Sequence, residues 1–151
     1  MVAQSTKNMD LFDSPVICEY LDSQHKGRKL FPRKGRDRWM ALRQQAMADG
    51  LLDAALLARY ESFLRPEEKR WPDWSKGQMK KIDGVLDQLE AESKALKGKP
   101  TIGTVSIGCA LGYLDFRFGH HDWRAKRPKL AKWYVAFAKT PSMKATVPPP
   151  A

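Results

Sequence analysis

The longest stretch of low charge in the chain is TIGTVSIGCALGYLDFR, at residues 101–117. Small and apolar residues fill most of it, and no acidic or basic side chain interrupts it before Asp115. A helix that is apolar on most sides is a buried helix. About 17 residues at 1.5 Å each give roughly 25 Å, which is enough to cross a small domain. The pattern therefore predicts a central helix around which the other helices pack.

Four further stretches have the spacing of apolar positions that is typical of amphipathic helices. The first is predicted to begin at Asp13 or Ser14, either of which can cap a helix, with Pro15 at its first position. It is predicted to end near Gln24. The other helices are predicted at residues 36–64, 73–95 and 128–139.

These elements add up to an all-α domain of five or six helices. In the helix at 36–64, we expect Trp39, Leu42, Ala46 and Leu51 to lie on one apolar side. Residues 9–12 are the one candidate for a piece of strand, and the final TPSMKATVPPPA is predicted to be a non-helical tail.

The composition is that of one folded domain of 151 residues. No apolar run reaches the roughly 18 residues of a membrane span, and the first residues lack an apolar signal core. Cys18 and Cys109 have no neighbours at metal-ligand spacing, and both are expected to be small buried hydrophobic residues. We therefore expect a cytoplasmic protein with no bound metal and no cofactor.

The chain is basic, with 27 Lys and Arg against 17 Asp and Glu, for a formal charge of +10. The basic residues are densest between Lys26 and Arg43. Such a charge permits binding to polyanions. However, no nucleic-acid motif accompanies it, and aromatic residues are not interleaved with it as a stacking surface needs. A solvated surface is the favoured interpretation, and a nucleic-acid partner is not expected.

Three stretches resemble the glutathione S-transferase family, in particular its bacterial members. They are LFDSPVICEYLD at residues 11–22, WMALRQQAMADGLLDAALLARY at 39–60, and TIGTVSIGCALGYLDFR followed by DWRAKRPKLAKWYVAFAKTPSMKAT. They are similar to the end of the family's thioredoxin-like first domain, to the first long helix of its second domain, and to its central and final helices. Together they cover nearly the whole chain after Met9.

The resemblance implies three segments. Residues 1–9 are expected to be a disordered tail, residues 10–32 a remnant of the thioredoxin-like domain with a linker, and residues 33–151 the helical C-terminal-like domain. The family's reaction transfers glutathione to an electrophile, so glutathione is the implied co-substrate. The residue that stabilises its thiolate has no counterpart here. We therefore expect a truncated protein that is inactive alone, and we assign no catalytic residue.

The resemblance also implies the site residues. Asp13 and Ser14 match the acidic residue and serine that bind the γ-glutamyl end of glutathione; the plain alternative is that they only cap the helix. Thr101 and Thr104 stand where the family has a capping box, a helix start in which two side chains bond each other's backbone N–H groups. The family usually has Asp at the second position, so Thr104 is expected to be a partial substitute.

Other polar residues are given structural roles. Asp49 and Asp53 share one helix face, where solvation or pairing with Arg43 or Arg59 is favoured over acid–base chemistry. His120 and His121 point apart and fit a connector. A buried ionic network is expected from Asp115, Arg117, Asp122 and Arg124, and core or interface anchors from Trp123, Trp133 and Tyr134.

Three functions remain open. The first is a glutathione S-transferase-like protein. The alternative is a non-catalytic helical module that binds a partner, either a second copy as a homodimer or a separate thioredoxin-like chain. A basic polyanion-binding protein is the third.

Overall fold

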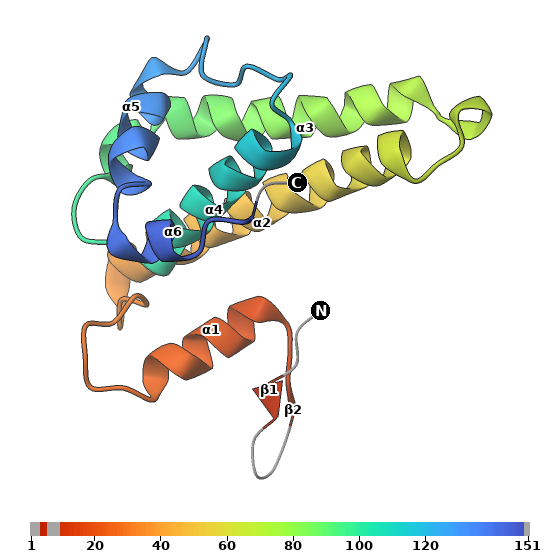
Figure 1. Cartoon of the computed structure of the whole chain (residues 1–151). Helices are drawn as coiled ribbons and strands as arrows, with labels where there is room; N and C mark the ends of the chain where they lie inside the picture. Colours follow the sequence, from red (N-terminus) through yellow and green to blue (C-terminus); the bar gives the residue numbers. More distant parts are fainter. Residues whose placement is uncertain (1–3, 6–9, 150–151) are drawn as a thin grey trace.

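The computed structural model describes residues 4–5 and 10–149 (Figure 1). A short antiparallel strand pair, β1 (Gln4–Ser5) and β2 (Asp10–Leu11), comes first. In the described part of the chain it is followed by six α-helices and two 3-10 turns. These are α1 (Ser14–Ser23), α2 (Gly35–Phe63), η1 (Glu67–Lys69), α3 (Pro72–Ala91), η2 (Ser93–Leu96), α4 (Ile102–Arg117), α5 (Pro128–Phe137) and α6 (Pro141–Ala145).

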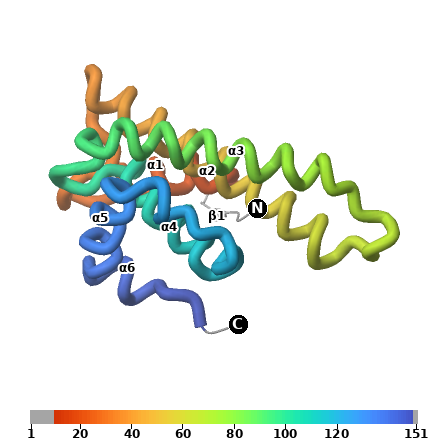
Figure 2. Tube along the Cα trace, turned by 90° about the horizontal axis from the view of Figure 1, so that it is seen from above, coloured from red at the N-terminus to blue at the C-terminus, as the bar shows by residue number. Residues whose placement is uncertain are grey.

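The helices α2 and α3 form a long hairpin, and α4 packs beside α2 (Figures 1 and 2). Ile107, Leu111 and Leu114 of α4 have no exposed surface and lie in the main core with residues of α2, α3 and α5. The prediction of a buried central helix is confirmed, as is the all-α class. No described helix is both long enough and apolar enough to cross a membrane.

The buried side of α2 was predicted only in part: Leu51 is buried in the main core and Leu42 packs on a smaller cluster, but Trp39 and Ala46 do not belong to this side. Trp39 is 70% exposed and Ala46 is exposed, whereas the contacts with α3 and α4 are made largely by small residues. The reason is the closeness of the helices: a Cβ on Gly103 of α4 would lie 2.5 Å from the Ala41 carbonyl oxygen of α2. Ala41 is buried at this contact, and further along α2 the buried side continues with Ala48, Ala54, Ala55 and Ala58 in the main core.

The N-terminus of α4 has both arms of the capping box. The Thr104 hydroxyl oxygen accepts from the Thr101 N–H at 2.9 Å, and the Thr101 hydroxyl oxygen accepts from the Thr104 N–H at 3.4 Å. The Thr104 hydroxyl also donates to the Thr101 carbonyl at 3.0 Å. The two threonines therefore satisfy the helix start without the usual carboxylate, although the second arm is long.

A polar clamp holds α1 and the linker to the helical body. Asp22, at the end of α1, accepts from the N–H groups of Leu30 at 2.8 Å and Phe31 at 3.3 Å. The Leu30 carbonyl then accepts from the Ile102 N–H at 2.9 Å, which ties the linker to the start of α4. A small apolar cluster lies beneath these bonds and contains Phe31, Ala41 and Ile102, with Cys18, Leu30 and Leu42 against it.

Several sequence expectations need correction. The helix predicted to reach residue 95 ends at Ala91 and is followed by the 3-10 turn η2. The tail is not wholly non-helical, because α6 begins at Pro141 and its Met143 packs on the core. Cys109 is exposed and Cys18 is half-buried. Of the predicted tail at 1–9, only β1 lies within the described residues.

Candidate functional site

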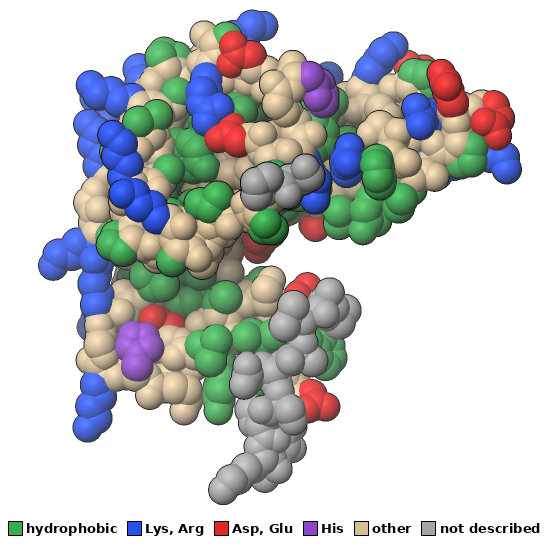
Figure 3. Space-filling model, viewed as in Figure 1, with side chains coloured by type: hydrophobic (Ala, Val, Ile, Leu, Met, Phe, Trp, Pro, Cys, Tyr) green, Lys and Arg blue, Asp and Glu red, His purple; other side chains and the backbone are tan. Residues whose placement is uncertain are grey.

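An open notch separates α1 from the helical body, and apolar side chains colour much of the α1 side that borders it (Figure 3). Three elements bring ionisable groups together across this notch. Asp13 and Cys18 come from α1, Asp49 comes from α2, and Cys109 comes from α4. Asp13 contributes to the raised pKa of Asp49, Asp49 to that of Cys18, and Cys18 to that of Cys109, so the notch is the first candidate for a binding site.

Asp13 and Ser14 stand at the α1 end of the notch and are both exposed. Asp13 is the N-cap: its Oδ1 accepts from the Ser14 N–H at 2.5 Å, and its carbonyl accepts from the N–H groups of Val16 and Ile17. The first-turn donors are therefore already used within the helix. Within the described residues, the Ser14 hydroxyl has no protein hydrogen-bond partner, and it remains available to a ligand.

Asp49 faces this end of the notch from α2. Burial raises the pKa of its carboxyl group, and the nearby carboxylates of Asp53 and Asp13 raise it further. The predicted pairing with arginine is wrong for both candidates, because Arg43 forms a bidentate ion pair with Glu92 and the Arg59 guanidinium lies over Phe63. The notch therefore carries negative charge that no described cation pairs, a surrounding that suits a ligand ammonium group.

Both cysteines are free thiols, Cys18 half-buried on α1 and Cys109 exposed on α4. Burial raises the pKa of the Cys18 thiol, and Asp49 adds to the effect. Burial also raises the pKa of the Cys109 thiol, with a further contribution from Cys18. Both thiols therefore hold their protons at neutral pH and are poor nucleophiles, since the thiolate is the reactive form.

A cavity of about 610 Å³ opens beside Cys109, between α4, α5 and the segment after α6. Most of its wall is apolar or aromatic and comes from Tyr113, Phe116, Tyr134 and Met143. Burial raises the pKa of the Tyr134 phenol, as does the charge of Asp115, while Arg124 opposes them. The cavity thus offers neutral hydroxyl and thiol groups on an aromatic wall, which suits a small, mostly apolar molecule.

An ion pair supports the far wall of this cavity. Arg124 donates to both oxygens of Asp115, at 2.6 and 2.5 Å, and the Trp123 indole N–H donates to the same carboxylate at 2.9 Å. The predicted network is therefore only partly right. It is not buried, and Arg117 lies over Phe116 instead of joining it. Trp123 is confirmed as a core residue.

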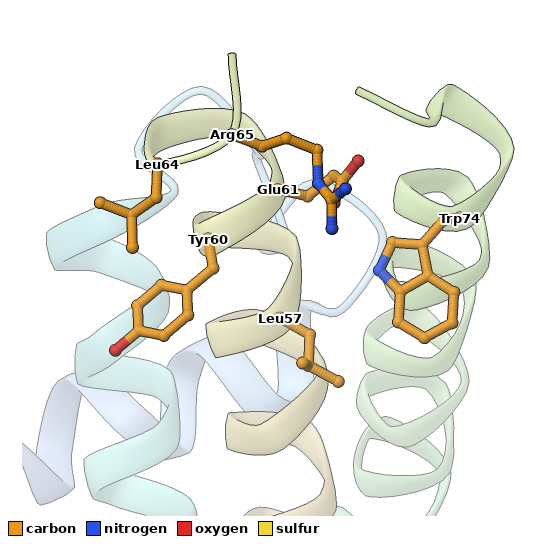
Figure 4. A pocket seen from close by; sticks show the side chains of 6 residues that line it. All are labelled: Leu57, Tyr60, Glu61, Leu64, Arg65 and Trp74. Carbon is orange, nitrogen blue, oxygen red and sulfur yellow. The ribbon is translucent and has the colours of Figure 1, made fainter. Parts of the chain in front are cut away.

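A second pocket lies far from the notch, at the end of the α2–α3 hairpin, and measures about 440 Å³. Figure 4 shows Arg65 beside Glu61, with Leu57, Tyr60, Leu64 and Trp74 around them. The buried Glu61 accepts from Arg65 at 2.7 Å and from the Trp71 N–H at 2.7 Å. The bond from Trp71 joins the start of α3 to α2, Arg65 neutralises the buried carboxylate, and we interpret Glu61 as a structural clasp of the hairpin.

The remaining sequence candidates have structural surroundings. His121 lies 3.2 Å from Asp83, and His120 packs on Phe118, so both fit the predicted connector. Among the residues that the structure describes, no three His, Cys, Asp or Glu side chains gather as a metal site would require. The cavity residues Tyr113 and Phe116 were missed, although their spacing of three on the central helix already placed them on one face.

Comparisons with known proteins identify this architecture. The chain matches the family described as glutathione S-transferase, C-terminal domain, over residues 72–136. It is 32% identical over 143 residues to the uncharacterized GST-like protein YibF of Escherichia coli K12, covering 93% of this chain and 70% of that protein. The chain belongs to the glutathione S-transferase family.

Solved structures agree with this assignment. A glutathione transferase family member from Pseudomonas fluorescens Pf-5 is 48% identical, with a TM-score of 0.94 over 97% of this chain. The match covers 76% of that protein in its structure with bound S-(propanoic acid)-glutathione and 73% in its structure with bound glutathione. A glutathione S-transferase of Methylobacillus flagellatus with bound glutathione is 33% identical, with a TM-score of 0.87 over 93% of this chain and 71% of that one.

Proposed function

We propose that this protein binds glutathione in the notch between α1 and the helical body. The observation that carries the proposal is the 48% identity and TM-score of 0.94 to a family member solved with glutathione bound. The chemistry of the notch supports it. The Ser14 hydroxyl at the start of α1 can donate to the γ-glutamyl carboxylate, and the helix dipole favours an anion there.

The acidic side chains of the notch fit the other charge of the γ-glutamyl group. Its ammonium can pair with the free oxygen of Asp13, and Asp49 adds negative charge from the opposite wall. The aromatic cavity beside Cys109 and Tyr134 is then the site for the group that becomes attached to the glutathione sulfur. A reducing, cytoplasmic setting agrees with the two free thiols.

We expect binding with little conjugation by this chain alone. Transfer needs a group that lowers the pKa of the glutathione thiol. The carboxylates of Asp13 and Asp49 do the opposite, because nearby negative charge disfavours a thiolate. A thioredoxin-like partner chain that supplies a hydrogen-bond donor to the sulfur would restore turnover.

Titration calorimetry with glutathione tests this proposal. Ser14→Ala leaves the Asp13 cap in place and removes one hydrogen bond to a charged group, so affinity should fall about tenfold. Ser23→Ala, at the exposed opposite end of α1, is the matched control and should bind as the parent does. Absence of binding in the parent, or equal affinity of the parent and Ser14→Ala, contradicts the proposed site.

A second candidate function is self-association through the end of the α2–α3 hairpin. Large apolar side chains stay exposed there, among them Tyr60, Phe63, Leu64 and Trp71, and a monomer rarely leaves such a group uncovered. Light scattering should then give the mass of two chains, and a Phe63→Ser/Leu64→Ser variant the mass of one. A parent that remains monomeric rules this function out.

A further inference from the structure

Cations gather on one edge of the molecule, and the fold brings them there from three separate segments. The chain has no Asp or Glu between Ser23 and Arg36, between Ser93 and Leu114, or after Asp122. These segments are the linker after α1, η2 with the turn into α4, and the region of α5 and α6. Figure 3 shows Lys and Arg along the left edge of the view, where Figure 1 places the linker, the turn after η2 and the start of α2.

Hydrogen bonds hold the three segments side by side. The Arg28 guanidinium donates to the Pro100 carbonyl at 3.0 Å, and the Ile102 N–H donates to the Leu30 carbonyl at 2.9 Å. The Trp133 indole N–H donates to the Leu96 carbonyl at 2.9 Å, which joins α5 to the end of η2. The cations of the linker, of the start of α2 and of the turn from η2 into α4 are therefore brought to one surface, and α5 lies against its η2 side.

Exposed cations without a described carboxylate partner also occur elsewhere, for example Lys69, Arg70 and Lys80, but this surface gathers six of them. The basic edge, as we name it, consists of Arg28, Arg33, Arg36, Lys94, Lys97 and Lys99, all exposed. Within the described residues none of the six pairs with a carboxylate. In contrast, Arg65, Arg124 and Arg127 each form an ion pair with Asp or Glu. Unpaired, exposed cations at this density attract an anionic polymer.

An aromatic side chain stands within the basic edge. Trp39 is 70% exposed and lies three residues after Arg36 and four before Arg43, hence on the same face of α2. Arg43 pairs with Glu92, the residue directly before η2. This contact places the Trp39 face of α2 next to Lys94. The expectation from the sequence that no aromatic residue is interleaved with the basic stretch therefore overlooked Trp39, which stands between Arg36 and Arg43.

We propose that the basic edge binds single-stranded nucleic acid. Its cations would neutralise successive phosphates, and a base would stack on the Trp39 indole, the combination used where strands are bound without sequence preference. The bases of a duplex are already stacked and cannot use the indole, so the single strand is favoured.

Fluorescence anisotropy with a labelled oligothymidine of about 20 nucleotides tests the proposal, since one site spans roughly 4–16 nucleotides in single-strand binders. We expect binding in about 50 mM salt and weaker binding to a duplex of equal length. The logarithm of the binding constant should fall linearly with the logarithm of the salt concentration, with a slope of about −0.7 for each phosphate neutralised. Trp39→Ala should weaken single-strand binding about tenfold with little change in that slope, and Trp39→Phe should retain most of the affinity.

Two triple variants of equal charge separate the basic edge from net charge. Arg28→Ser/Arg36→Ser/Lys97→Ser should reduce the salt slope by about 2. Lys69→Ser/Arg70→Ser/Lys76→Ser, at the far end of the hairpin, should leave it almost unchanged. Circular dichroism checks that each variant folds. The proposal is overturned by no binding at low salt, by equal losses in the two triple variants, by tighter binding to the duplex, or by binding to phosphatidylserine vesicles but not to the oligonucleotide.

Discussion

The helical body and the N-terminal region, residues 10–34, are held in place by different forces. The body surrounds α4 with a core of fully buried apolar residues, whereas α1 buries Ile17 and Asp22 and leaves Val16 and Leu21 half exposed. Packing therefore fixes the body, whereas α1 is held mainly by polar bonds, those of Asp22 to the linker and the ion pair of Glu19 with Arg38 of α2, together with the small apolar cluster near Cys18. A binding notch between a rigid wall and a weakly held wall can adjust to its ligand.

The largest expected effect tests whether the body supplies most of the stability. Leu111→Ala removes a side chain with no exposed surface from the centre of α4, and it should lower the free energy of unfolding by about 2–5 kcal/mol. Val16→Ala, on the 49% exposed face of α1, should change it by less than about 0.5 kcal/mol. Urea unfolding followed by circular dichroism measures both. If the two variants lost the same free energy of unfolding, the body and the N-terminal region would not differ in how they are stabilised.

The next prediction concerns the close contact between α2 and α4. A methyl group on Gly103 meets the Ala41 carbonyl oxygen at 2.5 Å, so Gly103→Ala should destabilise the body by about 1–3 kcal/mol. Gly84→Ala is the matched control in α3, where a new Cβ has no atom within 4 Å. It should stabilise the protein by about 0.5–1 kcal/mol, because alanine is the better helix former. Thermal unfolding of the two variants should shift in opposite directions.

The same difference between the regions explains what could be predicted from sequence. The helices α2, α3 and α5 were located from the spacing of apolar positions and α4 from its lack of charge, whereas the short α6 was missed. The buried face of α2 was predicted only in part, because large residues such as Trp39 dominate the apolar pattern whereas Ala41 and Gln44 stand opposite Gly103 and alanines fill much of the remaining buried face. Apolar size is a poor guide where two backbones approach closely.

The candidate site was predicted less completely. Asp13 and Ser14 carried a local signal, since a polar pair before a proline is a helix start. The approach of Asp49, Cys18 and Cys109 across the notch depends on how α1 folds back over the body, and no local pattern contains that information. The same holds for the basic edge, whose segments are joined only by tertiary hydrogen bonds.

The smallest expected effect concerns the polar clamp of the N-terminal region. In the parent protein, one carboxylate oxygen of Asp22 accepts from the Leu30 N–H and the other accepts from the Phe31 N–H. Asp22→Asn leaves a single amide oxygen to accept both bonds. We expect a loss of about 1–2 kcal/mol at neutral pH and faster hydrogen exchange at those two amides. Asp73→Asn, at an exposed ion pair with Lys76, is the control and should change stability by less than about 0.5 kcal/mol.

The pH dependence of the clamp has a defined sign. Burial disfavours the Asp22 carboxylate, but the Leu30 and Phe31 N–H groups and Lys29 outweigh burial and hold its pKa below the ordinary 3.8. A lowered folded-state pKa gives stability that is present above the unfolded value and is lost as pH falls through the folded one. The difference between the parent and Asp22→Asn should therefore be constant near neutrality and shrink below pH 3.8. A difference that grows in acid would mean that the clamp does not act through the carboxylate, and that α1 is held by its apolar contacts as the body is.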